Sequence, residues 1–133
     1  MAELSRGQAM ALLRWGPERL RYAVRLGRVH AYQRGRFFTY DPAELWEVSP
    51  EAREALMQLL RFSPRTEAGT HWTVASTRWR DLEDAGLIRV HRPVHPATGI
   101  QYSQEYWDAE LTELGKEVVE YLQQLLEDGH LEW

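Results

Sequence analysis

Cysteine is absent from this chain of 133 residues, which excludes disulfide bonds and thiolate metal sites and is typical of a cytoplasmic protein. Lysine is almost absent as well, because Lys116 stands alone against fifteen arginines. No apolar run approaches the roughly 18 residues that a membrane-spanning helix needs. The first ten residues lack the basic and apolar regions of a signal peptide. We therefore expect a cytoplasmic protein that has no membrane partner.

Motifs typical of catalytic and metal sites are also missing. The sequence has no glycine-rich phosphate loop, no G-x-S-x-G nucleophile turn and no H-E-x-x-H zinc motif. Glu83 and Asp84 are adjacent on an expected helix, so their carboxylates point in different directions and do not form a facing acid–base pair. His91 and His95 lie four residues apart without a carboxylate cluster beside them. We expect no enzyme activity, no metal and no cofactor.

Charge is distributed unevenly along the chain, whose formal net charge is −4. Residues 6–40 carry eight arginines against one carboxylate, a formal charge of +7, and six of these arginines lie in residues 19–36. Residues 103–133 carry one lysine against nine carboxylates, a formal charge of −8. Such asymmetry favours a basic end that meets a polyanion, although two solvated faces of one fold give the same pattern.

The first third of the sequence predicts two helices joined by a short turn. Ser5 caps a helix in RGQAMALL, and Pro17 fits the first position of a second helix, PERLRYAVRL, that ends at Gly27. In the second helix the spacing puts Leu20 and Ala23 on the packed side and displays the arginines on the other. Two helices joined by a three-residue turn that contains glycine are typical of a helix-turn-helix.

The following segment predicts a β-hairpin, or wing, and then a third helix. RVHAYQRGRFFTY has two β-prone halves around Gln33-Arg34-Gly35, and Gly35 supplies the positive φ that a tight turn requires. Asp41 and Pro42 restart a helix in DPAELWEV. Residues 4–47 therefore predict helix-turn-helix, wing and helix in that order.

This stretch, LSRGQAMALLRWGPERLRYAVRLGRVHAYQRGRFFTYDPAEL, resembles the small DNA-binding domain of the excisionase and MerR-like group. The shared pattern is a capped helix, a turn, a second helix ending in Leu-Gly, a strand, a basic glycine turn, an aromatic strand and a helix begun by Asp. Arg14-Trp15-Gly16-Pro17 departs from it, because the group has a small turn with a Ser or Thr cap here. The resemblance implies a second helix in the major groove and a wing on the backbone or minor groove.

The second half predicts a helix from Ser49 to residue 62, a helix capped by Ser76, a hairpin and a final helix capped by Thr112. The hairpin is expected to pair residues 87–91 with IQYSQEYW. The spacing of the helix after Ser76 buries Trp79, Leu82 and Ala85 and points Thr77, Arg78 and Asp81 outward. The segments DLEDAGLI and LTELGKEV make this half similar to a winged-helix domain of the MarR/PadR kind.

An apolar stripe on the final helix has two interpretations, which the sequence leaves open. Its members Leu114, Val118, Tyr121 and Leu125 recur at spacings of three and four. A stripe of this kind packs on the core of its own chain or forms the seam of a homodimer, as in winged-helix regulators that dimerise through their last helix.

These observations predict a mainly α protein with small β-hairpins, of the α+β class. Residues 1–48 would form an excisionase/MerR-like helix-turn-helix with a wing, and residues 49–133 a winged-helix-like domain with a C-terminal helix. The predicted function is sequence-specific binding of double-stranded DNA, by a transcriptional regulator or a phage or mobile-element accessory factor. The alternative is a protein-interaction module that docks on transcription machinery such as RNA polymerase. The residues expected at DNA are Arg19, Arg21, Tyr22, Arg25, Arg28, Arg34, Arg36, Thr77 and Arg78.

Overall fold

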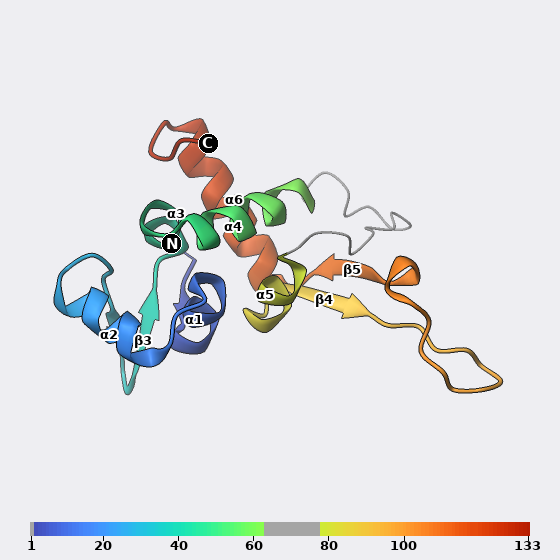
Figure 1. The fold of residues 1–133 in the computed structure, drawn as a ribbon. Helices are drawn as coiled ribbons and strands as arrows, with labels where there is room; N and C mark the ends of the chain where they lie inside the picture. Colours follow the sequence, from blue (N-terminus) through green and yellow to red (C-terminus); the bar gives the residue numbers. More distant parts are fainter. Residues whose placement is uncertain (1, 63–77) are drawn as a thin grey trace.

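The computed structural model describes residues 2–62 and 78–133, and these residues form helices and small antiparallel sheets of the α+β class (Figure 1). The first part of the chain forms β1 (Leu4–Ser5), α1 (Arg6–Leu13), α2 (Pro17–Arg25), β2 (Tyr32–Arg34), β3 (Phe37–Tyr40), α3 (Pro42–Val48) and α4 (Pro50–Phe62). The remainder forms α5 (Trp79–Asp84), β4 (Ile88–His91), a short 3-10 turn η2 (Gln104–Tyr106), β5 (Asp108–Leu111) and α6 (Glu113–Glu127).

The predicted ends of the first two helices are confirmed, because each has a local chemical cause. Ser5 and Gln8 form a reciprocal capping box, in which the Ser5 hydroxyl accepts the Gln8 backbone N–H at 3.2 Å and the Gln8 side chain accepts that of Ser5 at 2.8 Å. Pro17 opens α2, and Gly27 ends the helical region with a φ of +73°. This positive φ favours glycine, since it has no Cβ.

The predicted wing is confirmed as a hairpin, with its turn shifted by one residue. Arg34 pairs with Phe37, so Arg34 is the last residue of β2 and the turn consists of Gly35 and Arg36. Gly35 has the expected positive φ, +64°. The sequence did not predict β1, which adds Leu4 to the other side of β3 and gives a three-stranded antiparallel sheet in the order β1-β3-β2.

The second hairpin pairs differently from the prediction. β4 pairs with Asp108–Leu111, with Ile88 opposite Leu111, whereas IQYSQEYW lies farther out and contributes only an isolated bridge between Val94 and Gln101. The pairing follows burial, because Ile88, Leu111 and the intervening Val90 pack on the core while residues 93–106 extend beyond it. The expected helix cap Ser76 lies outside the described residues.

A single hydrophobic cluster runs through both predicted domains. The boundary at residue 48 falls between α3 and α4, which pack against each other, and α1 contacts α4 and α5. Two long-range hydrogen bonds strengthen the connection: Trp46 Nε1 donates to the Glu132 carbonyl at 3.1 Å, and the Tyr121 hydroxyl donates to Asp41 at 3.0 Å. The two halves thus share one core.

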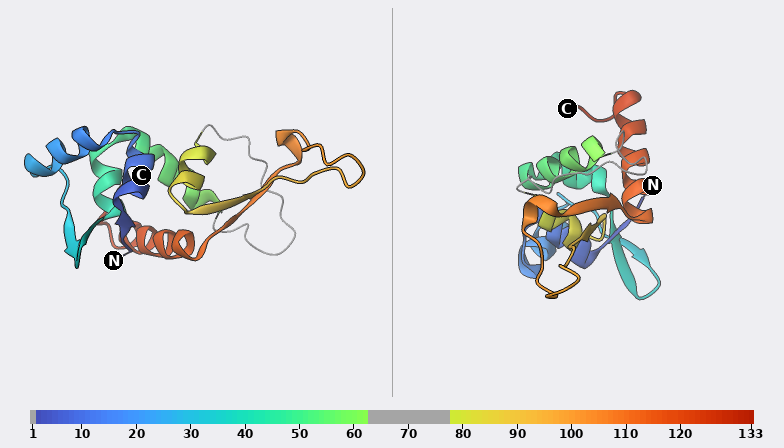
Figure 2. Two further views of the ribbon diagram at one scale, coloured as in Figure 1. Left: turned by 90° about the horizontal axis from the view of Figure 1, so that it is seen from below. Right: turned by 90° about the vertical axis from the view of Figure 1, so that its right-hand side faces the viewer.

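The two hairpins lie at opposite ends of the molecule. The end that carries α2 and the β2–β3 turn is basic, whereas the β4–β5 hairpin and its tip project from the other end (Figure 2). This arrangement separates the first hairpin from the second.

Candidate nucleic-acid interface

Helix α2 presents two arginines on its solvent face. Leu20 and Ala23 are buried, and Arg21 and Arg25, one turn apart on the opposite side, are exposed. Their side chains make no ion pair or hydrogen bond with any other residue that the structure describes. A helix face with free guanidinium groups one turn apart suits guanine edges or phosphates in a major groove.

The other predicted arginines of residues 19–36 are of two kinds: some have no side-chain partner in the described structure, and others contact a neighbouring side chain. Arg28 and Arg36 are exposed and, within the described residues, have no side-chain partner. Arg34 instead donates to Glu3, and this hydrogen bond lowers the pKa of the Glu3 carboxyl. Arg19 stacks on the Trp15 ring, with 4.6 Å between its guanidinium carbon and the ring centroid. Arg34 and Arg19 therefore have structural partners in the free protein.

Three aromatic or basic residues at this end were not predicted from sequence. Arg6, the first residue of α1, is exposed and unpaired within the described part of the chain. Phe37 and Phe38 on β3 are 75% and 49% exposed, and the predicted Tyr22 is 57% exposed. Neighbouring residues of a strand point to opposite faces of the sheet. Two consecutive phenylalanines in the sequence therefore indicate that each face of the wing carries one, and that one of these faces is not covered by the core.

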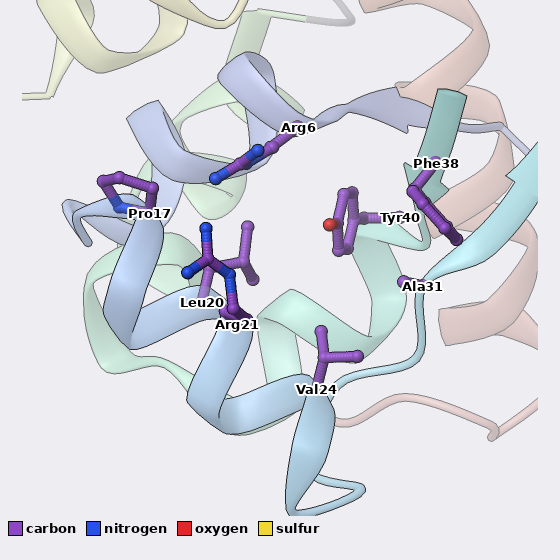
Figure 3. Close-up of a pocket in the computed structure, with 8 residues that line it drawn as sticks. All are labelled: Arg6, Pro17, Leu20, Arg21, Val24, Ala31, Phe38 and Tyr40. Carbon is purple, nitrogen blue, oxygen red and sulfur yellow. The ribbon is translucent and has the colours of Figure 1, made fainter. Parts of the chain in front are cut away.

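A pocket lies between the start of α1, α2 and the wing. Its volume is about 230 Å³, and Figure 3 shows Arg6 and Arg21 on one side of it and Phe38 and Tyr40 on the other. Tyr40 is buried, so its ring forms a fixed wall. The apolar lining is Pro17, Leu20, Val24, Ala31, Phe38 and Tyr40.

The acidic C-terminal helix does not neutralise this basic end. Helix α6 packs on α3, α4 and β5, and its carboxylates form no ion pair with an arginine of residues 19–36 in the described structure. Its one ion pair within the described residues joins Lys116 to Glu113 at 3.3 Å. In this fold the four arginines Arg21, Arg25, Arg28 and Arg36 stay exposed.

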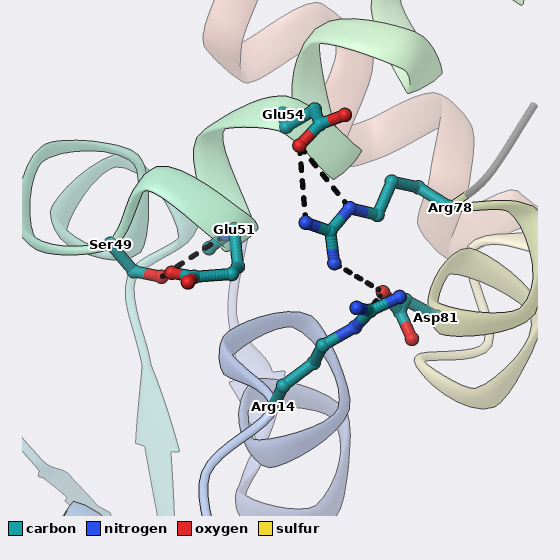
Figure 4. Close-up of polar contacts among 7 residues, drawn as sticks. Arg14, Ser49, Glu51, Glu54, Arg78 and Asp81 are labelled. Atoms are coloured by element: carbon teal, nitrogen blue, oxygen red, sulfur yellow. Dashed lines mark hydrogen bonds and ion pairs between the residues drawn. The ribbon is translucent and has the colours of Figure 1, made fainter.

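The prediction that Arg78 and Asp81 point outward is wrong. The Arg78 side chain is 12% exposed and pairs with Glu54 at 3.1 Å and Asp81 at 3.4 Å. Asp81 also accepts from Arg14 at 2.8 Å (Figure 4). Helix α5 lies against both α1 and α4, so its flanks are covered and only ion-paired charges fit there. Thr77, the other residue expected at DNA in this half, lies outside the described residues.

The second hairpin also lacks the charge of a DNA-binding wing. Residues 93–103 contain no lysine, arginine or carboxylate. The arginines at its base are paired, Arg89 with Glu110 at 3.0 Å and Arg92 with Glu83 at 2.7 Å. The candidate interface therefore excludes this end of the molecule.

The apolar stripe of α6 packs inside the chain. Val118 is completely buried, and Leu114, Tyr121 and Leu125 are half-buried against the core. Burial and the hydrogen bond to Asp41 raise the pKa of Tyr121, and burial also raises that of Asp41. The stripe thus packs on the core of its own chain while three of its residues keep part of their surface exposed, and the homodimer stays a prediction.

No group of three or more metal-ligating side chains occurs in residues 2–62 and 78–133. Over the same residues, none of the helices is long and apolar enough to cross a bilayer. Comparison of the chain with protein-family models, with curated proteins and with solved structures finds no match. Function must consequently be inferred from the geometry alone.

Proposed function

We propose that the protein binds double-stranded DNA sequence-specifically, with α2 in the major groove and the β2–β3 wing on the adjacent backbone or minor groove. The observation that carries the proposal is a set of exposed arginines without partners among the described residues. They come from α1, α2, the loop after α2 and the turn of the wing, and none of them forms an ion pair with a described carboxylate of the acidic helix. The set is Arg6, Arg21, Arg25, Arg28 and Arg36.

The order of elements supports the same proposal. A capped helix, a three-residue turn, a second helix, a hairpin and a third helix follow one another over β1 to α3 as in the excisionase and MerR-like resemblance. Helix-turn-helix domains place the second helix against base edges and use flanking elements for phosphates. The role we propose is that of a transcriptional regulator or a mobile-element accessory factor.

The test separates reading of bases from contact with phosphates. Duplexes are first selected from a random pool for binding to the parent protein. The variants Arg21→Ala and Arg25→Ala should then lose about 1–3 kcal/mol of sequence preference at particular base pairs of these duplexes. Arg36→Ala in the wing should weaken all duplexes by a similar factor. The control Arg89→Ala removes the same charge from the distant hairpin and should leave binding unchanged. Equal, sequence-blind losses from both helix variants contradict placement of α2 in a groove.

A second candidate function, protein docking, is favoured by the distal hairpin. Its tip is uncharged, and four large side chains on the arm are exposed: Val94, Ile100, Tyr102 and Tyr106. Apolar and aromatic side chains without charge are typical of the centre of protein interfaces. A protein that binds DNA by one end would contact the transcription machinery by the other. Deleting the tip residues 94–101 should then abolish the partner contact and preserve DNA binding.

A further inference from the structure

The pocket beside α2 combines an apolar interior with two free positive charges. Arg6 comes from the first turn of α1 and Arg21 from α2, so elements that are separate in sequence direct both guanidinium groups to one side of the pocket (Figure 3). Neither side chain has a carboxylate partner among the described residues. Two like charges beside an apolar surface repel each other, and an anion between them would relieve that repulsion.

The interior restricts what kind of anion fits. Among the described lining residues, the polar side-chain groups are the guanidinium groups of Arg6 and Arg21 and the Tyr40 hydroxyl, and the other contacts come from apolar side chains. A ligand that is polar on every side would lose hydrogen bonds to water against the apolar lining, so the ligand has its charge at the arginines and an apolar part against the other side chains. A volume of about 230 Å³ lies below the roughly 300–1,000 Å³ of pockets for drug-sized ligands, so a single ring is the appropriate size.

We propose that this pocket binds a small ligand made of one aromatic ring and one carboxylate. The ring lies against Phe38 and Tyr40, whose faces suit offset or edge-to-face contact. The carboxylate lies between Arg6 and Arg21, because a guanidinium group donates two parallel hydrogen bonds to a carboxylate.

The site has a regulatory consequence that rests on the proposed function. Arg21 belongs to the helix face proposed to enter the major groove, so one side chain cannot serve the ligand and the DNA at once. Each therefore weakens binding of the other by the same factor, as linkage requires. The ligand would act as an effector that releases the protein from DNA.

Calorimetric titration of the full chain with benzoate tests the pocket, and benzamide provides the control because it has the same shape without the charge. Benzoate should bind and benzamide should bind at least tenfold more weakly. Arg6→Gln and Arg21→Gln should each reduce benzoate affinity about tenfold, as expected for loss of a charged hydrogen bond. Arg28→Gln, an exposed arginine outside the pocket, should leave it unchanged. Equal affinity for the two compounds, or no binding of benzoate up to about 10 mM, overturns the proposal.

A second titration tests competition and keeps the two proposals distinguishable. At benzoate tenfold above its Kd, with sodium chloride matched in the control, the apparent Kd for DNA should rise about tenfold. An unchanged Kd for DNA overturns the effector role. A parent protein that binds no DNA refutes the proposed function, whereas the calorimetric result alone decides whether the pocket binds the ligand.

Discussion

Among the described glycines, Gly115 in α6 has the least room for a side chain. A Cβ built on Gly115 would lie 2.0 Å from the backbone carbonyl oxygen of Leu87. That oxygen already accepts the backbone N–H of Thr112 at 3.1 Å, and the Thr112 hydroxyl donates to the neighbouring Gly86 carbonyl at 2.6 Å. Alanine at this position must therefore displace backbone that is hydrogen-bonded to the start of α6.

The net effect of Gly115→Ala combines opposing contributions. Alanine improves helix propensity by about 1 kcal/mol. Overpacking costs about 1–3 kcal/mol, and loss of the hydrogen bond to Leu87 costs about 1 kcal/mol more. We expect the free energy of unfolding to fall by about 1–3 kcal/mol, because backbone atoms yield less readily than side-chain ends. For a domain of this size that is a fall in Tm of roughly 4–12 °C.

Urea denaturation followed by circular dichroism measures this change directly. Gly7→Ala is the matched control, because Gly7 lies in helix α1 and a Cβ at that position would meet no other atom within 4 Å. That variant should gain about 0.5–1 kcal/mol in stability. A Gly115→Ala protein as stable as the parent would refute the close packing of α6 on Leu87.

Two further predictions concern charged groups inside the fold. Burial raises the pKa of Asp41 above its ordinary value, so its protonated form stabilises the fold at low pH and this contribution is lost as the pH rises through the raised pKa. Asp41→Asn, which does not titrate, should therefore gain stability relative to the parent as the pH rises from about 4 through the raised pKa. Urea titrations at a series of pH values measure this, and parallel profiles would contradict it. Asp81→Ala removes a carboxylate that pairs with both Arg14 and the largely buried Arg78. It should cost about 2–3 kcal/mol in the same assay, and a loss below about 0.5 kcal/mol would show that the cluster does not stabilise the fold.

Helix ends could be predicted from the sequence because their causes are local. Ser5 and Thr112 accept backbone N–H groups within three residues of themselves, and Pro17 needs no donor at the first position of α2. Gly27 adopts the positive φ that is typical of a glycine at the end of a helix. None of these features depends on a contact with a distant part of the chain.

The errors concern features that depend on distant contacts. Arg78 was expected in solvent, since the spacing on α5 shows one buried face but not that α4 covers a flank as well. The strand that pairs with β4 is residues 108–111 and not the predicted IQYSQEYW, because residues 108–111 bury Leu111 on the core. At the candidate site, the arginines of α2 follow from its amphipathic pattern, whereas Arg6 joins them only through the approach of α1 to α2.

The most direct test of the DNA-binding proposal is the salt dependence of affinity for a duplex selected from a random pool. Five free arginines, Arg6, Arg21, Arg25, Arg28 and Arg36, lie on the proposed face. Arg21 and Arg25 are proposed to reach bases, so if Arg6, Arg28 and Arg36 contact phosphates, the logarithm of the association constant should fall with the logarithm of salt concentration at a slope of about −3. A flat response, or no binding at low salt, would contradict the account.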